Sequence, residues 1–145
     1  MKQLGQKYIK YLFFFITILF IFNGCDNIND SQIPDVPFTI NIDLNIRNDL
    51  TVPGNSMLFP NYGYGGVIVT CGPSGEYYAY DAACTYEIRQ SCKIKNEGIT
   101  GTCECCGSQF LLIYEAFPTS GPAAAPLRQY QVSRVNSFTL RVYNY

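Results

Sequence analysis

Apolar and polar residues alternate without a break through residues 38–47, and this pattern constrains the fold more than any other feature of the sequence. Successive side chains of a β-strand point to opposite faces, so a period of two residues predicts a strand with one buried face. The apolar members of the pattern are Phe38, Ile40, Ile42, Leu44 and Ile46. This segment is therefore expected to pack one face of a sheet against a core.

Turn residues separate further pairs of short apolar or alternating segments, and these pairs predict β-hairpins. They are residues 67–71 with 76–80, residues 92–95 with 99–102, and residues 127–135 with 138–142. Residues 110–114 add another strand, which brings the total to eight or nine. No segment after residue 25 has a helical pattern, so the sequence predicts one all-β domain.

The N-terminal segment has the parts of an export signal. Lys2, Lys7 and Lys10 precede an apolar run over residues 11–22, which leads to Gly24-Cys25. About 12 apolar residues are too few to span a bilayer, which needs about 20. The segment resembles a bacterial lipoprotein signal, and this implies cleavage before Cys25 and attachment of acyl chains such as palmitate to that cysteine. The alternative is an ordinary cleaved signal and a secreted soluble protein.

These features divide the chain into three predicted regions: a lipoprotein signal peptide at residues 1–24, a flexible tether at residues 25–37 and a folded domain at residues 38–145. The tether is rich in Asp, Asn, Ser and Pro and has no periodicity. Lipidated Cys25 would hold the protein on a membrane of the cell envelope, on the periplasmic or the surface side.

The chain contains no His among its 145 residues, which excludes several kinds of chemistry. Ser-His-Asp and Cys-His nucleophilic catalysis, His-containing zinc hydrolase sites and C-x-x-C-H haem attachment all need imidazole. The formal net charge is −1, and no basic patch follows the N-terminal segment, so no nucleic-acid partner is expected.

Six cysteines follow Cys25, and export to the cell envelope would permit them to form disulfides. Cys84 lies at the exit of a predicted strand, and Cys103-Glu104-Cys105-Cys106 follows a predicted hairpin. Two rigidly held loops of this kind can each deliver ligands to one metal centre. The sequence therefore predicts a metal site shared by two cysteine-bearing loops.

The two loops also resemble the Rieske family, whose pattern is C-x-H, a spacer and C-P-C-H-G-S-x-F. Here Cys84-Thr85-Tyr86, sixteen residues, and Cys103-Glu104-Cys105-Cys106-Gly107-Ser108-Gln109-Phe110 fall in register. Gly121-Pro122-Ala123-Ala124-Ala125-Pro126-Leu127 is similar to the family loop that covers the cluster. The resemblance extends over residues 65–145. It implies Rieske-like stacked antiparallel sheets with two Cys-bearing hairpin loops, and a [2Fe-2S] cluster that transfers electrons.

The chain departs from the family at the ligands. Tyr86 and Cys106 stand where the family has its two histidines, while Cys84 and Cys103 keep the thiolate positions, so a His₂Cys₂ centre cannot form. The metal ligands implied by the resemblance are Cys84, Tyr86, Cys103 and Cys106. The family also has a disulfide between its boxes; Cys105 matches one partner, and Cys92 could replace the other, whose position is Arg89.

Six thiols can divide into one bridge and four thiols, or into three bridges. In the first case Cys92 and Cys105 form the bridge, and Cys84, Cys103 and Cys106 bind metal with Tyr86 or Cys71 as fourth donor. Thiolate-rich sites suit an iron–sulfur cluster or Zn²⁺. In the second case no metal is bound.

Two functions follow from these alternatives. The first is a membrane-anchored electron-transfer or metal-binding module that meets a redox partner. The second is a cluster-free, disulfide-stabilised domain that binds another envelope protein. We do not expect an enzyme, because the acidic loop residues Glu87 and Glu104 are best interpreted as solvated carboxylates.

Overall fold

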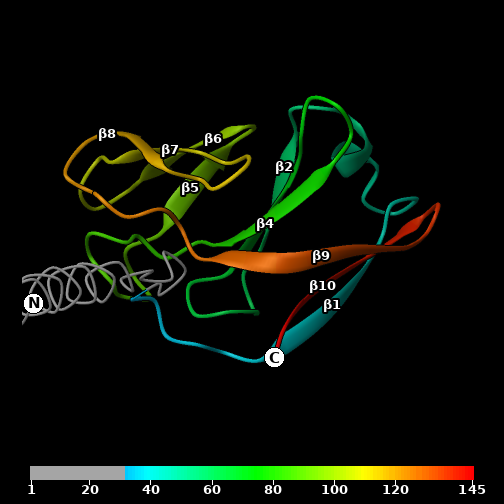
Figure 1. Ribbon diagram of the computed structural model, residues 1–145, viewed down its shortest axis with the longest axis horizontal. Coiled ribbons are helices and arrows are strands. Elements are labelled where there is room, and N and C mark those ends of the chain that lie inside the picture. The colour runs from blue at the N-terminus through cyan, green and yellow to red at the C-terminus, as the bar shows by residue number, and fades with distance from the viewer. Residues whose placement is uncertain (1–31) are drawn as a thin grey trace, which may run out of the picture. The chain divides into compact units, whose positions relative to one another are not determined.

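Within residues 32–145, ten strands form two antiparallel sheets, and one short 3₁₀ helix lies outside the sheets (Figure 1). The computed structural model describes residues 32–145; the predicted signal peptide and the lipidation site Cys25 lie outside this range. The elements are β1 (Phe38–Asp43), η1 (Asn48–Thr51), β2 (Ser56–Phe59), β3 (Val67–Cys71), β4 (Tyr77–Asp81), β5 (Ile94–Glu97), β6 (Thr100–Cys103), β7 (Gln109–Leu111), β8 (Pro118–Ser120), β9 (Gln129–Asn136) and β10 (Thr139–Asn144). The prediction of an all-β fold is confirmed.

The larger sheet has six strands in the order β1-β10-β9-β4-β3-β2, and the smaller has four in the order β5-β6-β7-β8. The three predicted hairpins are present as β3–β4, β5–β6 and β9–β10. Two strands were not predicted. β8 consists of Pro118, Thr119 and Ser120, which have no apolar alternation, and no residue of β2 is fully buried.

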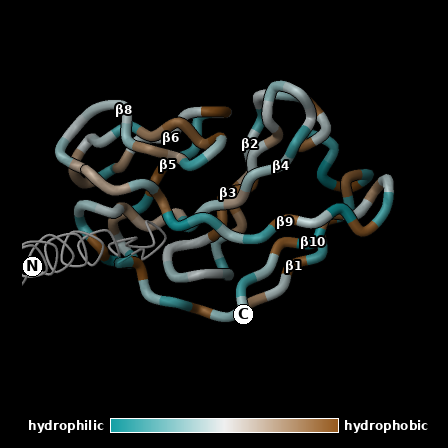
Figure 2. The backbone as a smooth tube through the Cα atoms, in the orientation of Figure 1, coloured by the Kyte–Doolittle hydropathy of each residue, from teal (hydrophilic) through white to brown (hydrophobic). Residues whose placement is uncertain are grey.

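Strands β3 and β4 form a wall between two hydrophobic cores. Every residue of β3 is buried, because Val67 and Val69 face one core while Ile68 faces the other. Figure 2 shows the hydropathy of each residue along the backbone. In β4, Ala79 faces the core it shares with Val67 and Val69, and Tyr80 faces the core of Ile68. A strand buried on both faces has a continuous apolar sequence, which matches residues 67–69.

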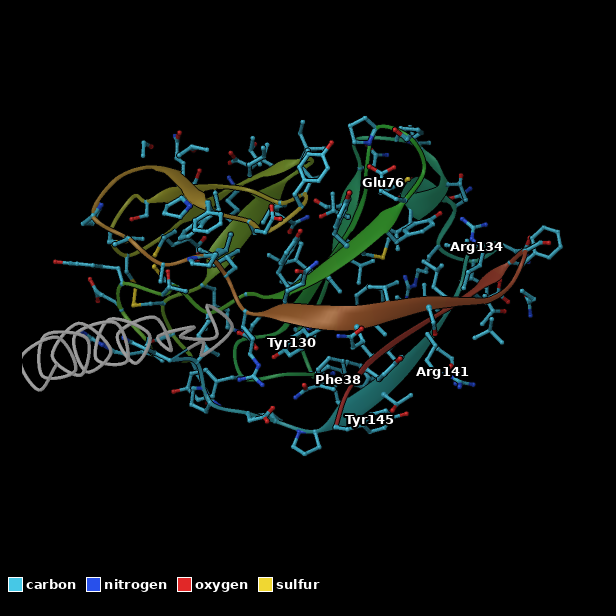
Figure 3. All side chains as sticks on the ribbon, viewed as in Figure 1. Phe38, Glu76, Tyr130, Arg134, Arg141 and Tyr145 are labelled. Carbon is cyan, nitrogen blue, oxygen red and sulfur yellow. A yellow bond between two sulfur atoms is a disulfide. The ribbon has the colours of Figure 1, made fainter. Side chains whose placement is uncertain are left out.

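One core belongs to the large sheet and the other lies under the small sheet. The first contains side chains of β1, β3, β9 and β10, and the ring of Phe38 meets that of Tyr130 edge-on with centroids 4.7 Å apart (Figure 3). The second core, which we call the sulfur core, contains Ile68, Tyr80, Ala82, Cys84, Cys92, Ile94, Cys103, Phe110, Leu112, Ala116, Ala123 and Leu127.

Part of the predicted tether is fixed on the domain. Ile33 is buried, and its carbonyl accepts a hydrogen bond from Arg128 Nη1 at 3.0 Å. Asp35 pairs with Arg128 Nη2 at 2.6 Å and also accepts from the Asn144 amide. The prediction of a flexible tether over residues 25–37 is therefore wrong for residues 33–35, because buried apolar surface and an ion pair hold them in place. Within residues 32–145 no helix has the length and apolar character needed to cross a membrane.

Candidate metal centre

Strand pairing brings the two cysteine segments together. Ala83 forms an isolated β-bridge with Lys93, and the Cys84 N–H donates to the Cys92 carbonyl at 3.0 Å. The same strand continues into β5, where Ile94 pairs with Cys103 of β6. Residues 92–94 thus lie between Cys84 and Cys103 and set their separation. Alternation along β4 also places Cys84 on the same side as Tyr80 and Ala82, which all belong to the sulfur core.

A buried carboxylate fixes the backbone just before Cys84. Asp81 is fully buried, and its oxygens accept the N–H groups of Tyr64 at 2.7 Å, Gly65 at 2.9 Å and Ala83 at 2.7 Å. The phenol of Tyr130 donates to the same carboxylate at 2.6 Å. These four donors compensate the buried charge, because a buried carboxylate needs hydrogen bonds to be tolerated.

The sulfur atoms of Cys84, Cys103 and Cys106 all lie within 4.8 Å of one another. Cys84 Sγ and Cys106 Sγ are 3.5 Å apart. Cys84 and Cys103 are buried, whereas Cys106 is partly exposed, so the site has a closed side in the core and an open side at Cys106. We call these three residues the sulfur triad.

A tight turn carries Cys103 and Cys106. The Gly107 N–H donates to the Cys103 carbonyl at 3.0 Å, and the Cys103 N–H donates to the Ser108 carbonyl at 2.8 Å. Gly107 has φ of 72°, a conformation that residues with a side chain rarely adopt. The turn therefore points two sulfurs, from cysteines with two residues between them in a C-x-x-C spacing, toward one place.

The loop of residues 121–127 packs on this turn. Gly121 approaches Ser108 so closely that a Cβ at Gly121 would lie 2.5 Å from Ser108 Cα. The Ala123 N–H donates to Ser108 Oγ at 3.0 Å, and Thr85 Oγ1 donates to the Ala125 carbonyl at 2.8 Å. The loop thus joins both cysteine segments and contributes Ala123 and Leu127 to the sulfur core.

A disulfide between Cys92 and Cys105 links the two cysteine segments, as the family resemblance implied. Glu87 lies against this bridge, with its Oε2 3.5 Å from Cys92 Sγ and 3.1 Å from Arg89 Nη2. In the described part of the chain the remaining thiols are Cys71, Cys84, Cys103 and Cys106. The structure therefore has one bridge and four thiols, not three bridges.

The pKa values of Cys84 and Cys106 are shifted in opposite directions. Burial raises the pKa of the Cys84 thiol to about 12, although the backbone N–H groups of Glu87 and Tyr86 partly offset this. Burial also tends to raise the pKa of Cys106, but hydrogen bonds from Ser108 and from the other two triad thiols bring it below its ordinary value. Without a cation, Cys84 is thus a neutral thiol at pH 7, and Cys106 ionises more readily.

The two predicted fourth donors differ in their relation to the triad. Tyr86 is 57% exposed and touches the site through its backbone N–H. Cys71 pairs with Tyr77 at the opposite end of the β3–β4 hairpin. The seven steps along the chain from Tyr77 to Cys84 correspond to roughly 23 Å of extended chain. Cys71 therefore cannot join the triad in this fold.

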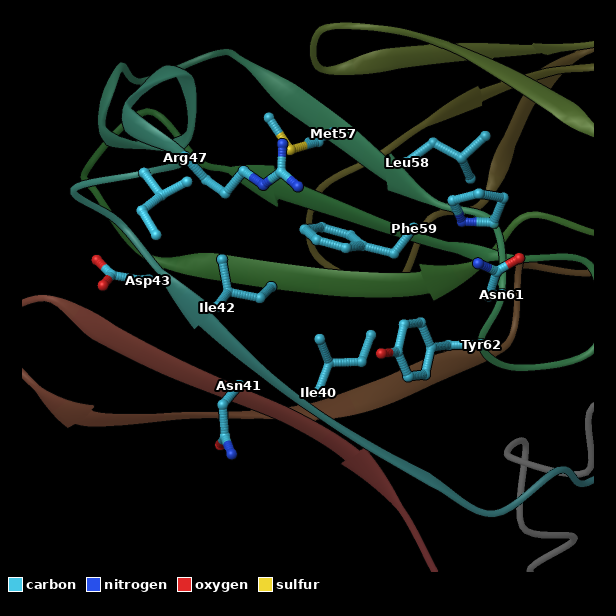
Figure 4. A pocket seen from close by; sticks show the side chains of 12 residues that line it. Ile40, Asn41, Ile42, Asp43, Arg47, Met57, Leu58, Phe59, Asn61 and Tyr62 are labelled. Atoms are coloured by element: carbon cyan, nitrogen blue, oxygen red, sulfur yellow. The ribbon is translucent and has the colours of Figure 1, made fainter.

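Two cavities lie elsewhere in the domain. One of about 620 Å³ opens between β1 and β2, among side chains such as Ile42, Met57 and Phe59 (Figure 4). The other, of about 500 Å³, is lined by Cys71, Tyr77 and Arg134 among others. Neither cavity includes a residue of the sulfur triad.

Comparison with solved structures identifies the architecture. A chain of the complex of reduced oxygenase and oxidized ferredoxin in carbazole 1,9a-dioxygenase matches with a TM-score of 0.53 and 19% identity, over 72% of this chain and 92% of that one. The ferredoxin of carbazole 1,9a-dioxygenase from Nocardioides aromaticivorans IC177 matches with a TM-score of 0.50 and 19% identity, over 77% of this chain and all of that one. The domain has a Rieske-like fold. No family model and no curated protein sequence matches the chain.

The residues present do not fit the centre that a Rieske-like fold usually carries. That centre needs four ligands, two on each iron, and two of them are imidazoles. The chain has no His, and the site brings together three sulfurs rather than two separated pairs. The C-x-x-C spacing of Cys103 and Cys106 is a sequence signal for a different site, since this spacing is typical of two ligands to one ion. The family pattern, which assigns Cys106 to a histidine position, obscured that signal.

Proposed function

We propose that this protein is a membrane-anchored metal-binding module of the cell envelope, held by lipidated Cys25, with Cys84, Cys103 and Cys106 as protein ligands. The convergence of three sulfurs from two loops carries this proposal. Ferredoxins have the same Rieske-like fold, and this supports a function in electron transfer rather than in catalysis. Bound iron would supply one-electron chemistry to a redox partner, whereas bound zinc would supply none.

Each part of the site has a role in this function. The buried side excludes water and holds Cys84 and Cys103 in fixed positions, while the Cys92–Cys105 bridge keeps the two loops together. Ser108 Oγ accepts the Ala123 N–H and also the Cys106 thiol, 3.2 Å away. When Cys106 is a thiolate, the Ser108 O–H can instead donate to its sulfur. Hydrogen bonds of this kind stabilise the thiolate that a cation needs.

The second candidate is a disulfide-stabilised domain that binds another envelope protein without any metal. The Cys92–Cys105 bridge and the two separate cores favour it, because they stabilise the fold independently of a cation. The two candidates differ in what the triad thiols do. In the second, Cys84 and Cys103 are buried side chains of the sulfur core, and Cys106 packs against it without binding metal.

Metal analysis of anaerobically purified full-length protein distinguishes the candidates. We expect zinc or iron to copurify, and we expect Cys103→Ser to lose it while Cys71→Ser retains it. Cys71→Ser is a matched control, since Cys71 is also a buried free thiol but lies at the other end of the hairpin. Metal-free protein that keeps its fold and cannot be loaded with zinc or iron would support the second candidate.

A further inference from the structure

We infer that the sulfur triad binds one tetrahedral ion of the zinc or ferrous class, with the fourth position open to a ligand from solution. The inference rests on the proposed metal-binding function and specifies what the same site takes. It replaces the two-iron cluster that the Rieske-like fold would suggest.

Distances between the sulfurs favour one ion. Tetrahedral thiolates about 2.3 Å from Zn²⁺ lie about 3.8 Å from one another. All three sulfur separations in the triad are below 4.8 Å, and the one between Cys84 and Cys106 is 3.5 Å. A two-iron cluster places its ligands in two pairs on opposite irons, so sulfurs of different pairs lie farther apart than sulfurs on one ion. Three mutually close sulfurs match three corners of a single tetrahedron.

The chain path leads to the same conclusion. Cys103 and Cys106 belong to one turn that Gly107 closes, and two ligands separated by two residues are a common way to chelate one ion. Cys84 reaches them from the neighbouring strand through the Ala83 to Lys93 bridge. The ligands therefore come from one chelating turn and one strand end, rather than as one pair from each loop.

We assign the fourth corner to the open side of the site, where Cys106 is partly exposed. Among the described residues, no Asp or Glu oxygen joins the three sulfurs within 4.8 Å. Glu87 is occupied by Arg89, and the covering loop at residues 121–127 has only Gly, Pro, Ala and Leu side chains. Three protein ligands with one exchangeable position is the arrangement of ions that bind a small molecule, whereas purely structural zinc sites use four protein ligands.

Titration with Co²⁺, a spectroscopic substitute for Zn²⁺, tests this inference on the detergent-solubilised full-length apo protein. We expect saturation at one Co²⁺ per chain, with the visible bands of a tetrahedral thiolate site. Added imidazole should shift these bands by entering the fourth position. Cys103→Ser should weaken binding by more than about 100-fold, since loss of an outer partner alone costs about 10- to 100-fold.

Two variants complete the design. Tyr86→Phe removes the phenol but keeps the backbone N–H, so the Co²⁺ bands should stay unchanged if the fourth ligand comes from solution. Cys71→Ser should also leave the titration unchanged. Co²⁺ bands that shift in the Tyr86→Phe variant but do not change when imidazole is added would contradict an open fourth coordination position.

Other outcomes separate this inference from the proposed function. Reconstitution that gives two irons and two acid-labile sulfides per chain would overturn the single ion and leave metal binding intact. A folded protein that binds neither Co²⁺ nor Zn²⁺ nor iron, with the triad thiols free, would overturn both.

Discussion

At the scale of single residues, the buried Asp81 carboxylate is the clearest determinant of stability near the site. Tyr130→Phe removes one of its four hydrogen-bond donors and changes no apolar volume. Because this hydrogen bond involves a charged acceptor, we expect the free energy of unfolding to fall by about 1.5–3 kcal/mol in urea denaturation. Tyr145→Phe, at an 85% exposed position, is the control and should change it by less than about 0.5 kcal/mol. Equal stability of the two variants would show that the hydrogen bond to Asp81 contributes little.

Two buried tyrosines also predict how stability depends on pH. Burial raises the pKa of both Tyr80 and Tyr130 above the ordinary value of 10.0, and the Asp81 carboxylate raises that of Tyr130 further. The unfolded chain therefore loses these protons first, and stability that is complete below pH 10 is lost as the pH rises above it. The slope should approach about 1.4 kcal/mol per pH unit for each tyrosine.

The absorbance of tyrosinate checks this directly. We expect Tyr80 and Tyr130 to ionise together with unfolding, because their pKa values are raised in the folded protein. Tyr130→Phe should reduce the late absorbance change by one tyrosine. Full ionisation of all tyrosines in a protein that stays folded would contradict the prediction.

At the scale of elements, we expect the packing of the loop of residues 121–127 on the turn of residues 103–108 to position the sulfur triad. Gly121→Ala tests it, with Gly75→Ala as a matched control. Both glycines have a positive φ, 90° and 84°, so both substitutions share a backbone cost of about 1–2 kcal/mol. A Cβ at Gly121 meets Ser108 backbone at 2.5 Å, whereas a Cβ at Gly75 meets nothing within 4 Å.

We therefore expect Gly121→Ala to destabilise the domain more than Gly75→Ala, and to lower metal affinity because Ser108 hydrogen-bonds to Cys106. Urea denaturation and Co²⁺ titration measure the two effects. Equal losses for both variants, or normal Co²⁺ affinity in Gly121→Ala, would mean that the covering loop does not position the triad.

Some of the strands could be predicted from the sequence and others could not. The alternation from Phe38 and the apolar run of β3 predicted their strands, because burial on one or two faces leaves a direct pattern in the sequence. β8 left no such pattern, since its residues Pro118, Thr119 and Ser120 are mostly exposed and are held by pairing with β7. The segment at Ile33 was predicted as a tether because its residues are largely polar and have no periodicity. Its contact with Arg128 joins residues 95 positions apart, which leaves no local pattern in the sequence.

The candidate site was predictable to a similar extent. Family spacing identified Cys84, Cys103 and Cys106, and the structure brings these three thiols together. For the bridge, the spacing identified Cys105 but placed its partner at Arg89, and the structure has Cys92 in that role. The exposure of Tyr86 and the distance of Cys71 depend on the path of the folded chain, which local sequence patterns do not encode.

At the scale of the whole molecule, the number of reactive thiols reports both the bridge and the predicted lipid anchor. The described residues contain four free thiols and one disulfide. Lipidation would consume the Cys25 thiol, so the mature, unfolded and unreduced protein should titrate with four thiols per chain. The Cys25→Ser protein should also have four thiols, but it should no longer be found in the membrane fraction, because the acyl chains that anchor the protein would be missing. Five thiols in the wild-type protein would contradict lipidation, and two or fewer would contradict the single bridge.

The most direct test of a single ion held by the sulfur triad is X-ray absorption at the metal edge of the loaded full-length protein. We predict three sulfur neighbours at about 2.3 Å, one lighter N or O neighbour and no second metal nearby. A metal–metal neighbour, or a shell without sulfur, would contradict the conclusion that Cys84, Cys103 and Cys106 together bind one ion.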